Sequence, residues 1–501
     1  MPIIYINYVA SSNRVSMLMP QRKLLITFFL LFTLTFTLVT CTGSQTQISP
    51  QPQATSQKTE QTTEQTTEEK PILNIWWSQG FLPEENQAIT DLVLDWEKET
   101  GMKANLRLEA ENNLLSSTRT AIENNKTPDV LLIYSADADL FPILAWQNKL
   151  ADVSDLIEPI KDTFTPSALE AVNYQNSVQD KKRSYYAVPI AQQAPHIFYW
   201  RNLLAQSGFT EPKLPKNWEE FWQIWPKAQQ QLRQKGNNNI YGMGLTISSL
   251  GADTSLAFEQ FLEAYNVKIV AEYGKLIIDN PGNREGIIAA LKQYTDNYKN
   301  GYIPANVVEW KDSGNNVSFL EGESLMTINS TLSIPLTQKQ ENNPYNKNSR
   351  DLYYQKIAMT EWPNKPNGQP LTSILGIKQA VVFENSKNKE AAKSFLSFFL
   401  KGQNMDKFLQ AQKGRLFPVI SKVLQEPYWK DPSDPHLSAA NNQFFKETRP
   451  PYQVFNPAYS EVTAQQIWPK AILSIIKDGV TPEDAADKAI EQINQIFANW
   501  K

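Results

Sequence analysis

Residues 128–134 read Pro-Asp-Val-Leu-Leu-Ile-Tyr, an apolar run without polar alternation that decides how the rest of the chain is interpreted. Such a run is typical of a strand in a parallel sheet that is covered on both faces. Residues 72–77 form another short apolar run, and Ala104, Leu106 and Leu108 recur at the period of a strand. Helical patterns separate these segments, so the order predicts a βαβαβ unit in an open α/β sheet.

The first helical pattern has both of its ends marked in the sequence. Pro83 opens it, two glutamates follow at once, and Gly101 stops it. Its apolar face consists of Ile89, Leu92, Val93 and Trp96. These positions predict an amphipathic helix that packs on the sheet.

The turns that follow two of the strands are the first candidates for a binding site, because open α/β sheets bind ligands beyond the carboxyl ends of their strands. The first strand ends at residues 77–79 (Trp-Ser-Gln), and the third ends at residues 134–137 (Tyr-Ser-Ala-Asp). Each turn also has a structural alternative. Trp77 and Tyr134 would fit a core, and Asp137 would fit the cap of the next helix.

A second set of elements begins after residue 190. Strand-like runs at 240–247, 324–328, 356–359 and 376–383 alternate with helices. Residues 217–220 and 481–484 carry helix-start signals. The body from residue 71 to 501 is too long for one hydrophobic core, so two domains or more are expected.

The amino-terminal region predicts export and a lipid anchor. Arg22 and Lys23 precede an uncharged apolar run at 24–40, and Cys41, the only cysteine, follows it. This order resembles a bacterial lipoprotein signal, with Thr40 standing where that pattern prefers Gly, Ala or Ser. A membrane-spanning anchor needs about 20 apolar residues, which is more than this run offers. We expect residues 1–40 to be a cleaved signal, with Met17 or Met19 as alternative starts, and Cys41 to carry lipid.

Residues 41–70 then form the link between the anchor and the folded body. They are dominated by Thr, Gln, Ser, Glu and Pro. Such a segment cannot bury enough apolar surface to fold, so we expect a disordered tether.

Composition excludes several classes of function. A net charge of −4 provides no excess of basic residues for binding nucleic acid. A single cysteine cannot form a disulfide within the chain. His196 and His436 are the only histidines, so we expect no metal and no cofactor. No motif of phosphate binding or of nucleophilic catalysis is present. A lipid-anchored glycosidase stays open as an alternative, because its paired carboxylates could not be recognised among 52 acidic residues.

A series of short motifs runs in order through the body. They are 73–77 (Leu-Asn-Ile-Trp-Trp), 127–130 (Thr-Pro-Asp-Val), 186–189 (Tyr-Ala-Val-Pro), 198–204 (Phe-Tyr-Trp-Arg-Asn-Leu-Leu), 215–221 (Pro-Lys-Asn-Trp-Glu-Glu-Phe), 325–329 (Leu-Met-Thr-Ile-Asn), 385–392 (Asn-Ser-Lys-Asn-Lys-Glu-Ala-Ala) and 414–418 (Gly-Arg-Leu-Phe-Pro). In this order they resemble the extracellular solute-binding proteins of ABC importers, in the carbohydrate-binding branch akin to maltose-binding protein.

The resemblance implies a type II periplasmic-binding-protein fold, with two α/β lobes joined by crossing strands and a ligand cleft between them. The first lobe would comprise residues 71–190 and 376–419, and the second residues 191–375 and 420–501. It also implies a monomer without enzymatic activity. This monomer would close around a sugar, deliver it to the membrane permease, and face the periplasm or the cell exterior on its lipid anchor.

The resemblance also implies which residues would contact the sugar. Sugar hydroxyls need donors and acceptors, and the faces of pyranose rings lie on aromatic planes. The family's acidic contact on the crossing strand aligns with Gln193, a neutral replacement, and Trp362 could supply an aromatic platform. The full set of expected contacts is Trp77, Ser78, Gln79, Tyr134, Ser135, Asp137, Gln193, Ser248, Asp253, Asn329, Trp362 and Tyr459.

Overall fold

The computed structural model describes residues 72–179, 182–211, 214–339 and 349–500 of the 501-residue chain. The predicted signal, Cys41 and the predicted tether lie outside the described residues. Within the described ranges, no helix combines the length and the apolar character needed to cross a bilayer.

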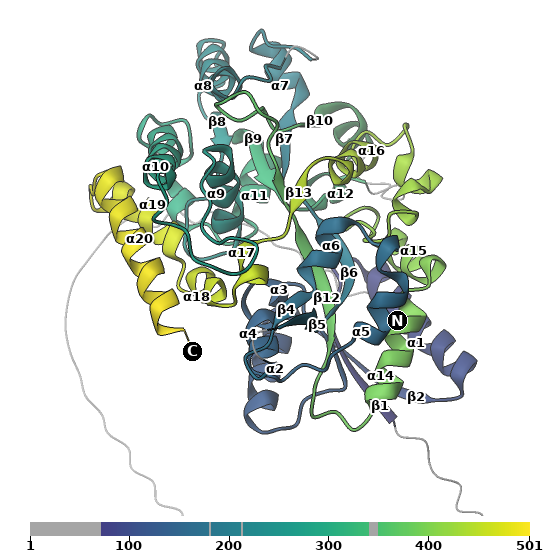
Figure 1. Ribbon diagram of the computed structural model, residues 1–501. Helices are drawn as coiled ribbons and strands as arrows, with labels where there is room; N and C mark the ends of the chain where they lie inside the picture. Colours follow the sequence, from purple (N-terminus) through teal and green to yellow (C-terminus); the bar gives the residue numbers. More distant parts are fainter. Residues whose placement is uncertain (1–71, 180–181, 212–213, 340–348, 501) are drawn as a thin grey trace, which may run out of the picture. The chain divides into compact units, whose positions relative to one another are not determined.

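The first sheet confirms the predicted βαβαβ unit (Figure 1). Its strands lie in the order β2 (Lys103–Glu109), β1 (Ile72–Ser78), β3 (Val130–Leu132), β12 (Gly376–Val382) and β6 (Val188–Gln193). β1 pairs in parallel with β2 and β3, whereas β12 is antiparallel to β3 and β6. Helices α1 (Pro83–Thr100) and α2 (Glu111–Glu123) connect the first three strands.

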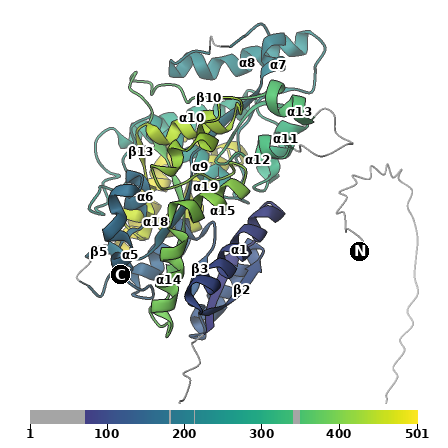
Figure 2. The same cartoon turned by 90° about the vertical axis from the view of Figure 1, so that its right-hand side faces the viewer.

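Helix α1 forms where the sequence predicts it. Ile89, Leu92 and Trp96 are buried on its inner face, and Gly101 ends it with φ of +67°, a conformation that glycine adopts without strain. Figure 2 shows α1 beside α14 (Lys389–Phe399) and α15 (Gly402–Ala411), and α1 contacts both helices. These helices cover one face of the first sheet.

The second sheet forms the core of the other lobe. Its strands lie in the order β10 (Ile357–Thr360), β7 (His196–Trp200), β9 (Ser324–Asn329) and β8 (Tyr241–Gly244). The helices around it include α8 (Trp218–Gln234), α9 (Asp253–Ala264) and α10 (Asn283–Lys299). The predicted helix starts are confirmed, because the side chains of Asn217 and Thr481 accept hydrogen bonds from the amides of Glu220 and Asp484.

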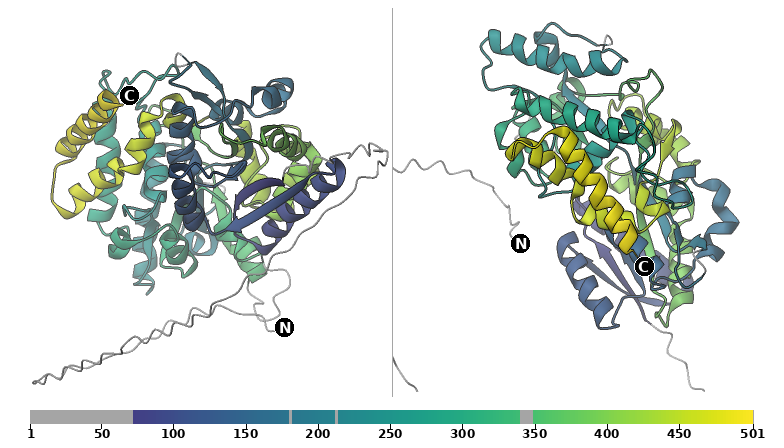
Figure 3. Two further views of the ribbon diagram at one scale, coloured as in Figure 1. Left: turned by 90° about the horizontal axis from the view of Figure 1, so that it is seen from below. Right: turned by 60° about the vertical axis from the view of Figure 1, so that its left-hand side comes forward.

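The carboxyl-terminal helices complete the second lobe. α19 (Ile467–Lys477) and α20 (Pro482–Asn499) pack on α10, as the right-hand view of Figure 3 shows. α18 (Ala458–Ala464) contacts α20 and also α3 (Ala136–Asp139) of the first lobe. The last part of the chain therefore touches elements of both lobes.

The chain passes between the two sheets at several places. β6 of the first sheet is followed by residues 194–195 and then by β7 of the second sheet. β11 (Ser373–Ile374) pairs with β13 (Thr448–Arg449) and leads directly into β12. The lobe boundaries predicted near residues 190, 375 and 419 stay predictions at the level of single residues.

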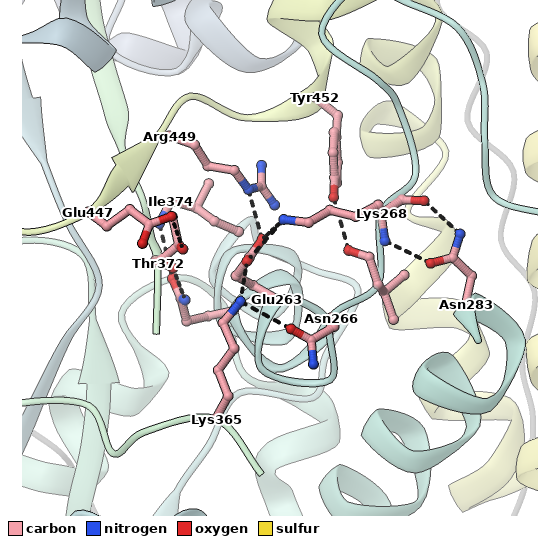
Figure 4. A network of polar contacts seen from close by, with 12 residues as sticks. Glu263, Asn266, Lys268, Asn283, Lys365, Thr372, Ile374, Glu447, Arg449 and Tyr452 are labelled. Atoms are coloured by element: carbon pink, nitrogen blue, oxygen red, sulfur yellow. Dashed lines mark hydrogen bonds and ion pairs between the residues drawn. The ribbon is translucent and has the colours of Figure 1, made fainter. Parts of the chain in front are cut away.

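A buried ion cluster attaches α9 to the β11–β13 crossing (Figure 4). The fully buried Glu263 carboxylate accepts hydrogen bonds from Lys365 Nζ at 2.9 Å and from Arg449 Nε at 2.9 Å, and Lys268 Nζ lies 3.2 Å away. Burial raises the pKa of Glu263, but the cations around it outweigh burial and leave its pKa below the usual value. Gln260 Nε2 donates a hydrogen bond to the Thr372 carbonyl, and its Oε1 accepts one from the Ile374 amide.

Candidate ligand-binding site

A cavity of about 330 Å³ lies among the carboxyl-terminal ends of strands from both sheets. Residues that follow β3, β6 and β9 line it, as expected for an α/β sheet that binds ligands at its strand ends. Its lining includes Glu111, Tyr134, Ser135, Asp137, Gln193, Asp253, Glu259, Asp312, Asn316, Asn329, Gly376, Lys378 and Arg415. Both lobes therefore contribute walls to one cavity.

A larger hollow of about 980 Å³ lies elsewhere, between α8 and α10. Residues of the second lobe alone line it, and none of the residues predicted to contact a ligand is among them. We therefore place the candidate site at the cavity that both lobes share.

Arg415 and Tyr134 form one side of the first-lobe wall. The guanidinium carbon lies 4.8 Å from the centre of the tyrosine ring, and Glu85 holds the guanidinium from behind. Burial raises the pKa of Tyr134 to about 12, so its hydroxyl stays protonated at neutral pH. Gly414 places Arg415 there with φ of +87°, and a side chain at this glycine would meet Leu437 Cδ1 at 2.6 Å.

Asp137 and Lys378 form the other side of the first-lobe wall. Lys378 Nζ lies 3.4 Å from Asp137 Oδ1, and both residues are buried. Burial raises the pKa of Asp137, although the Lys378 ammonium acts in the opposite direction. The pair fixes one carboxylate and one ammonium at the end of β3.

Gln193 is a buried amide without a hydrogen-bond partner among the described residues, and it lines the cavity. Its strand neighbour Gln192 is fully buried, accepts a hydrogen bond from Thr165 Oγ1 at 3.2 Å and donates to the Pro418 carbonyl at 2.6 Å. A side chain at Gly376 would approach Gln193 Cγ to 3.0 Å, so the glycine leaves room for the amide. Alternation along β6 thus makes Gln192 structural and leaves the Gln193 amide free for a ligand.

Carboxylates dominate the second-lobe wall. Asp253 begins α9, and burial together with the nearby Asp312 raises its pKa to about 7. Glu259 lies farther along the same helix, is 7% exposed, and accepts a hydrogen bond from the Tyr459 hydroxyl at 2.9 Å. Burial raises the pKa of Glu259 as well.

Asn329 and Asp312 complete this wall. Asn329 Nδ2 donates to Asn316 Oδ1 at 2.6 Å, and Asn329 Oδ1 accepts from the Thr331 amide at 3.0 Å. The exposed Asp312 accepts a hydrogen bond from the Ala252 amide at 2.6 Å. These bonds orient polar groups at the ends of β9 and at the start of α9.

Half of the predicted contact residues line the cavity and half do not. Those that line it are Tyr134, Ser135, Asp137, Gln193, Asp253 and Asn329. Those that do not are Trp77, Ser78, Gln79, Ser248, Trp362 and Tyr459. Contact of the first group with a ligand stays a prediction, and the second group lies outside the lining of this cavity.

The turn after β1 does not reach the cavity. The Trp77 indole is 1% exposed and packs against Phe399 and Phe408, with ring centres 5.8 and 5.9 Å away. Ser78 is buried, and the amide of the exposed Gln79 donates to the Glu109 carbonyl at 2.7 Å. Pairing of β1 with β2 thus continues to Gln79, and residues 77–79 are not part of the cavity lining.

The remaining three residues support the walls from outside the cavity. Ser248 Oγ accepts from the Leu250 amide at 2.9 Å within the loop before α9. Trp362 packs against Phe261, and its Nε1 donates to the Pro195 carbonyl at 2.9 Å. Tyr459 is fully buried behind Glu259 and also accepts a hydrogen bond from Trp468 Nε1.

Five charged residues of the cavity were absent from the sequence prediction, namely Glu111, Glu259, Asp312, Lys378 and Arg415. Glu111 stands just beyond the end of β2, so the strand-end rule could have found it. Arg415 lies within the 414–418 motif, but nothing local reveals that it turns to the cavity. The described residues contain no group of three or more His, Cys, Asp or Glu that could hold a metal ion.

Comparison with known proteins places the chain among binding proteins. The family model for bacterial extracellular solute-binding proteins matches residues 91–439. The galactooligosaccharide-binding protein of Bacillus subtilis (strain 168) is 21% identical over 422 residues, which are 81% of this chain and 86% of that protein. YcjN of Escherichia coli (strain K12), a candidate ABC transporter periplasmic-binding protein, is 23% identical over 334 residues, or 65% of this chain and 70% of YcjN.

Solved structures agree with the fold. The α-D-tagatose-bound ABC transporter solute-binding protein of Thermotoga lettingae has a TM-score of 0.65 at 20% identity, covering 85% of this chain and 99% of its own. The cyclic α-maltosyl-1,6-maltose-binding protein of Arthrobacter globiformis has a TM-score of 0.66 at 17% identity, covering 86% and 100%. The predicted two-lobed type II periplasmic-binding-protein fold is thereby confirmed.

Proposed function

Because this chain belongs to the bacterial extracellular solute-binding protein family, we propose that it captures a sugar between its two lobes and delivers it to the permease of an ABC importer. The observation that carries this proposal is the cavity that both lobes line with polar side chains at their strand ends. The sugar specificities of the relatives and structural neighbours support a carbohydrate as the solute.

The chemistry of the walls suits a polyhydroxylated solute. Gln193 offers a donor and an acceptor, carboxylates such as Glu259 accept from hydroxyls, and Arg415 donates. The Tyr134 ring is the aromatic surface of the cavity, although the Arg415 guanidinium lies against it. A hydroxyl held by such buried groups contributes to affinity because an unpaired partner would be costly.

Capture would proceed by closure of the lobes about the crossing segments. A sugar that contacts Gln193 on one wall and Asp253 on the other gains both interactions only when the walls approach each other. Such contacts, present in one state only, are what shifts the equilibrium toward the closed form. The closed form would then be recognised by the permease.

Family membership makes the protein an exported one, and its attachment to the membrane through Cys41 is a finer proposal. Mass spectrometry of protein extracted from membranes should find a lipidated cysteine at the mature amino terminus. Cys41→Ala should release the protein from the membrane while leaving its sugar affinity unchanged. A Cys41→Ala protein that stayed anchored would contradict the proposal.

The family consists of binding proteins, and nothing supports the glycosidase alternative. Calorimetry of the purified protein against mono- and oligosaccharides in chelator should find one class with micromolar or tighter affinity. The sugar should be recovered unchanged, and solution scattering should show compaction on binding. Binding of no sugar would refute the proposed function, and recovery of hydrolysed sugar would establish an enzyme.

A further inference from the structure

Acidic side chains in the cavity outnumber basic ones. Its lining contains the carboxylates of Glu111, Asp137, Asp253, Glu259 and Asp312, and two cations, Lys378 and Arg415. Glu259 is buried, Glu111 and Asp253 are half-buried, and Asp312 is exposed. Most of these acidic groups are therefore partly shielded from solvent, and electrostatic interactions are stronger in such surroundings than in water.

Both cations of the cavity are already paired within the first lobe. Lys378 lies against Asp137 at 3.4 Å, and Arg415 Nε is 3.0 Å from Glu85 Oε1. Neither ion pair includes Glu111 or any carboxylate of the second lobe. The lining cations thus leave four carboxylates uncompensated, namely Glu111, Asp253, Glu259 and Asp312.

No other described residue compensates these four carboxylates through an ion pair. The charge of Arg449 acts to lower the pKa of Glu259, but Arg449 Nε is already paired with Glu263 at 2.9 Å. The hydrogen bonds at Glu259 and Asp312 come from neutral donors, the Tyr459 hydroxyl and the Ala252 amide. Asp253 has no hydrogen-bond partner among the described residues, and its carboxylate is open to the cavity.

A bound metal ion does not account for this charge. Within the described ranges, no three His, Cys, Asp or Glu residues lie close enough together to hold one. The carboxylates are spread over α2, α9 and the segment before α11 (Gly314–Leu320). A distributed set of acceptors fits several groups along an extended solute better than it fits a single ion.

The raised pKa values of Asp253 and Glu259 agree with this arrangement. Burial is the main cause in both cases, so ionisation of these groups in the empty cavity is unfavourable. A cation between the walls would favour their ionised forms and would gain a charge-assisted hydrogen bond from each.

We propose that the sugar captured in this cavity carries a basic amine, so that the natural solute is an amino sugar or an oligosaccharide containing one. The inference rests on the proposed function, since it specifies the solute of the same site. The protonated amine lies against the second-lobe carboxylates, and acidic sugars are excluded by repulsion from the same wall.

Calorimetry on matched triplets of sugars tests this assignment. Each triplet has one skeleton in hydroxyl, free-amine and N-acetylated form, in the glucose, galactose and mannose series and in their α- and β-1,4 disaccharides. The amine member of the preferred series should bind at least about tenfold more tightly than the hydroxyl member. Its advantage should shrink as salt is raised from low to molar concentration.

Two variants and a control assign the effect to the wall. Asp253→Asn and Glu259→Gln should each remove most of the advantage of the amine while changing the affinity of the hydroxyl member less. Glu309→Gln removes one negative charge at an exposed position outside the cavity and should leave the advantage intact. An amide at position 259 can still accept the Tyr459 hydrogen bond, so folding should be preserved.

The outcomes separate this inference from the proposed function. If a neutral sugar binds tightly and its amine counterpart binds no better, the inference is wrong and the proposed function stands. Tighter binding of a uronic acid analogue would also overturn it. If no member of any triplet binds, the proposed function fails and the inference falls with it.

Discussion

Arg415 and Glu85 form a two-pronged ion pair across the first lobe, with Arg415 Nε 3.0 Å from Oε1 and Nη2 2.5 Å from Oε2. The Glu85 side chain is 1% exposed and that of Arg415 is 11% exposed. Glu85 Oε1 also accepts a hydrogen bond from the Leu82 amide at the start of α1. One carboxylate thus fixes both the first turn of α1 and a cation of the cavity wall.

Glu85→Ala should therefore reduce the free energy of unfolding by about 3–5 kcal/mol, because it leaves the Arg415 charge buried without its partner. Glu84→Ala is the matched control. Glu84 pairs with Lys413 at 2.8 Å, but the two side chains are 52% and 40% exposed. Its loss should cost less than about 1 kcal/mol. Urea unfolding measures both, and equal effects of the two variants would show that burial does not determine the value of the Arg415 pair.

Gln193 and its neighbour Gln192 offer a direct test of the binding site. Gln193→Ala should weaken sugar binding about 5- to 150-fold, because a sugar group left without its partner costs about 1–3 kcal/mol. Its effect on stability should be small, since the Gln193 amide makes no hydrogen bond within the described residues. Gln192→Ala should do the reverse, because it breaks the bonds to Thr165 and Pro418. Calorimetry measures the affinity of both variants and urea unfolding measures their stability. Unchanged affinity in Gln193→Ala would show that Gln193 does not contact the sugar.

The contrast between β1 and β3 explains how far the sequence could predict the site. Both apolar runs became strands, and the strand-end rule correctly identified Tyr134 and Asp137 as cavity residues. The turn after β1 lies outside the cavity lining, because Trp77 packs into the core and the Gln79 amide continues the pairing with β2. Hydrophobic periodicity marks where a strand lies but does not show how far its pairing continues.

The second-lobe wall was less predictable for a different reason. Glu259 lies in the middle of α9 among buried residues. The sequence around it therefore does not distinguish a cavity residue from a residue that serves only the packing of the helix. Its role depends on Tyr459, which is 200 residues away in the chain and donates to it. The prediction identified Tyr459, but the structure assigns the cavity position to Glu259 and the supporting position to Tyr459.

The two histidines predict how stability depends on pH. Burial lowers the pKa of His196 to about 3 and that of His436 to about 4, whereas an unfolded histidine titrates near 6.5. Below about pH 6.5 the unfolded chain therefore binds more protons than the folded one. The contribution of the two neutral histidines to the free energy of unfolding is fully present above this pH and is lost as the pH decreases toward 4. At pH 5 each histidine should lower the free energy of unfolding by about 2 kcal/mol relative to neutral pH.

Unfolding of His196→Asn and His436→Gln at pH 7 and at pH 5 measures this effect. Each variant should lose less stability than the wild type between the two pH values, even where its stability at pH 7 is lower. His436→Gln tests the pKa effect together with the hydrogen bond from Nε2 to the Tyr353 carbonyl at 2.8 Å. An unchanged difference between pH 7 and pH 5 in both variants would assign the acid sensitivity to carboxylates instead.

The last prediction concerns α9, which joins the cavity to the crossing. Asp253 and Glu259 lie on its cavity side, and Glu263 near its end binds Arg449 of β13 and Lys365 (Figure 4). Glu263→Gln should reduce the free energy of unfolding by about 3–5 kcal/mol, because two cations stay buried without a counter-charge. It should also weaken sugar binding by the folded protein, since the helix that carries the second-lobe wall loses its attachment to the crossing.

Lys268→Ala supplies the control within the same cluster. Lys268 also reaches Glu263, but its side chain is 50% exposed, so its removal should cost less than about 1 kcal/mol and leave sugar affinity unchanged. Urea unfolding followed by tryptophan fluorescence gives the stabilities, and calorimetry well below the unfolding transition gives the affinities. If Glu263→Gln lost stability but bound sugar as tightly as the wild type, α9 would be held at the cavity by its packing alone, and the ion cluster would serve only the fold.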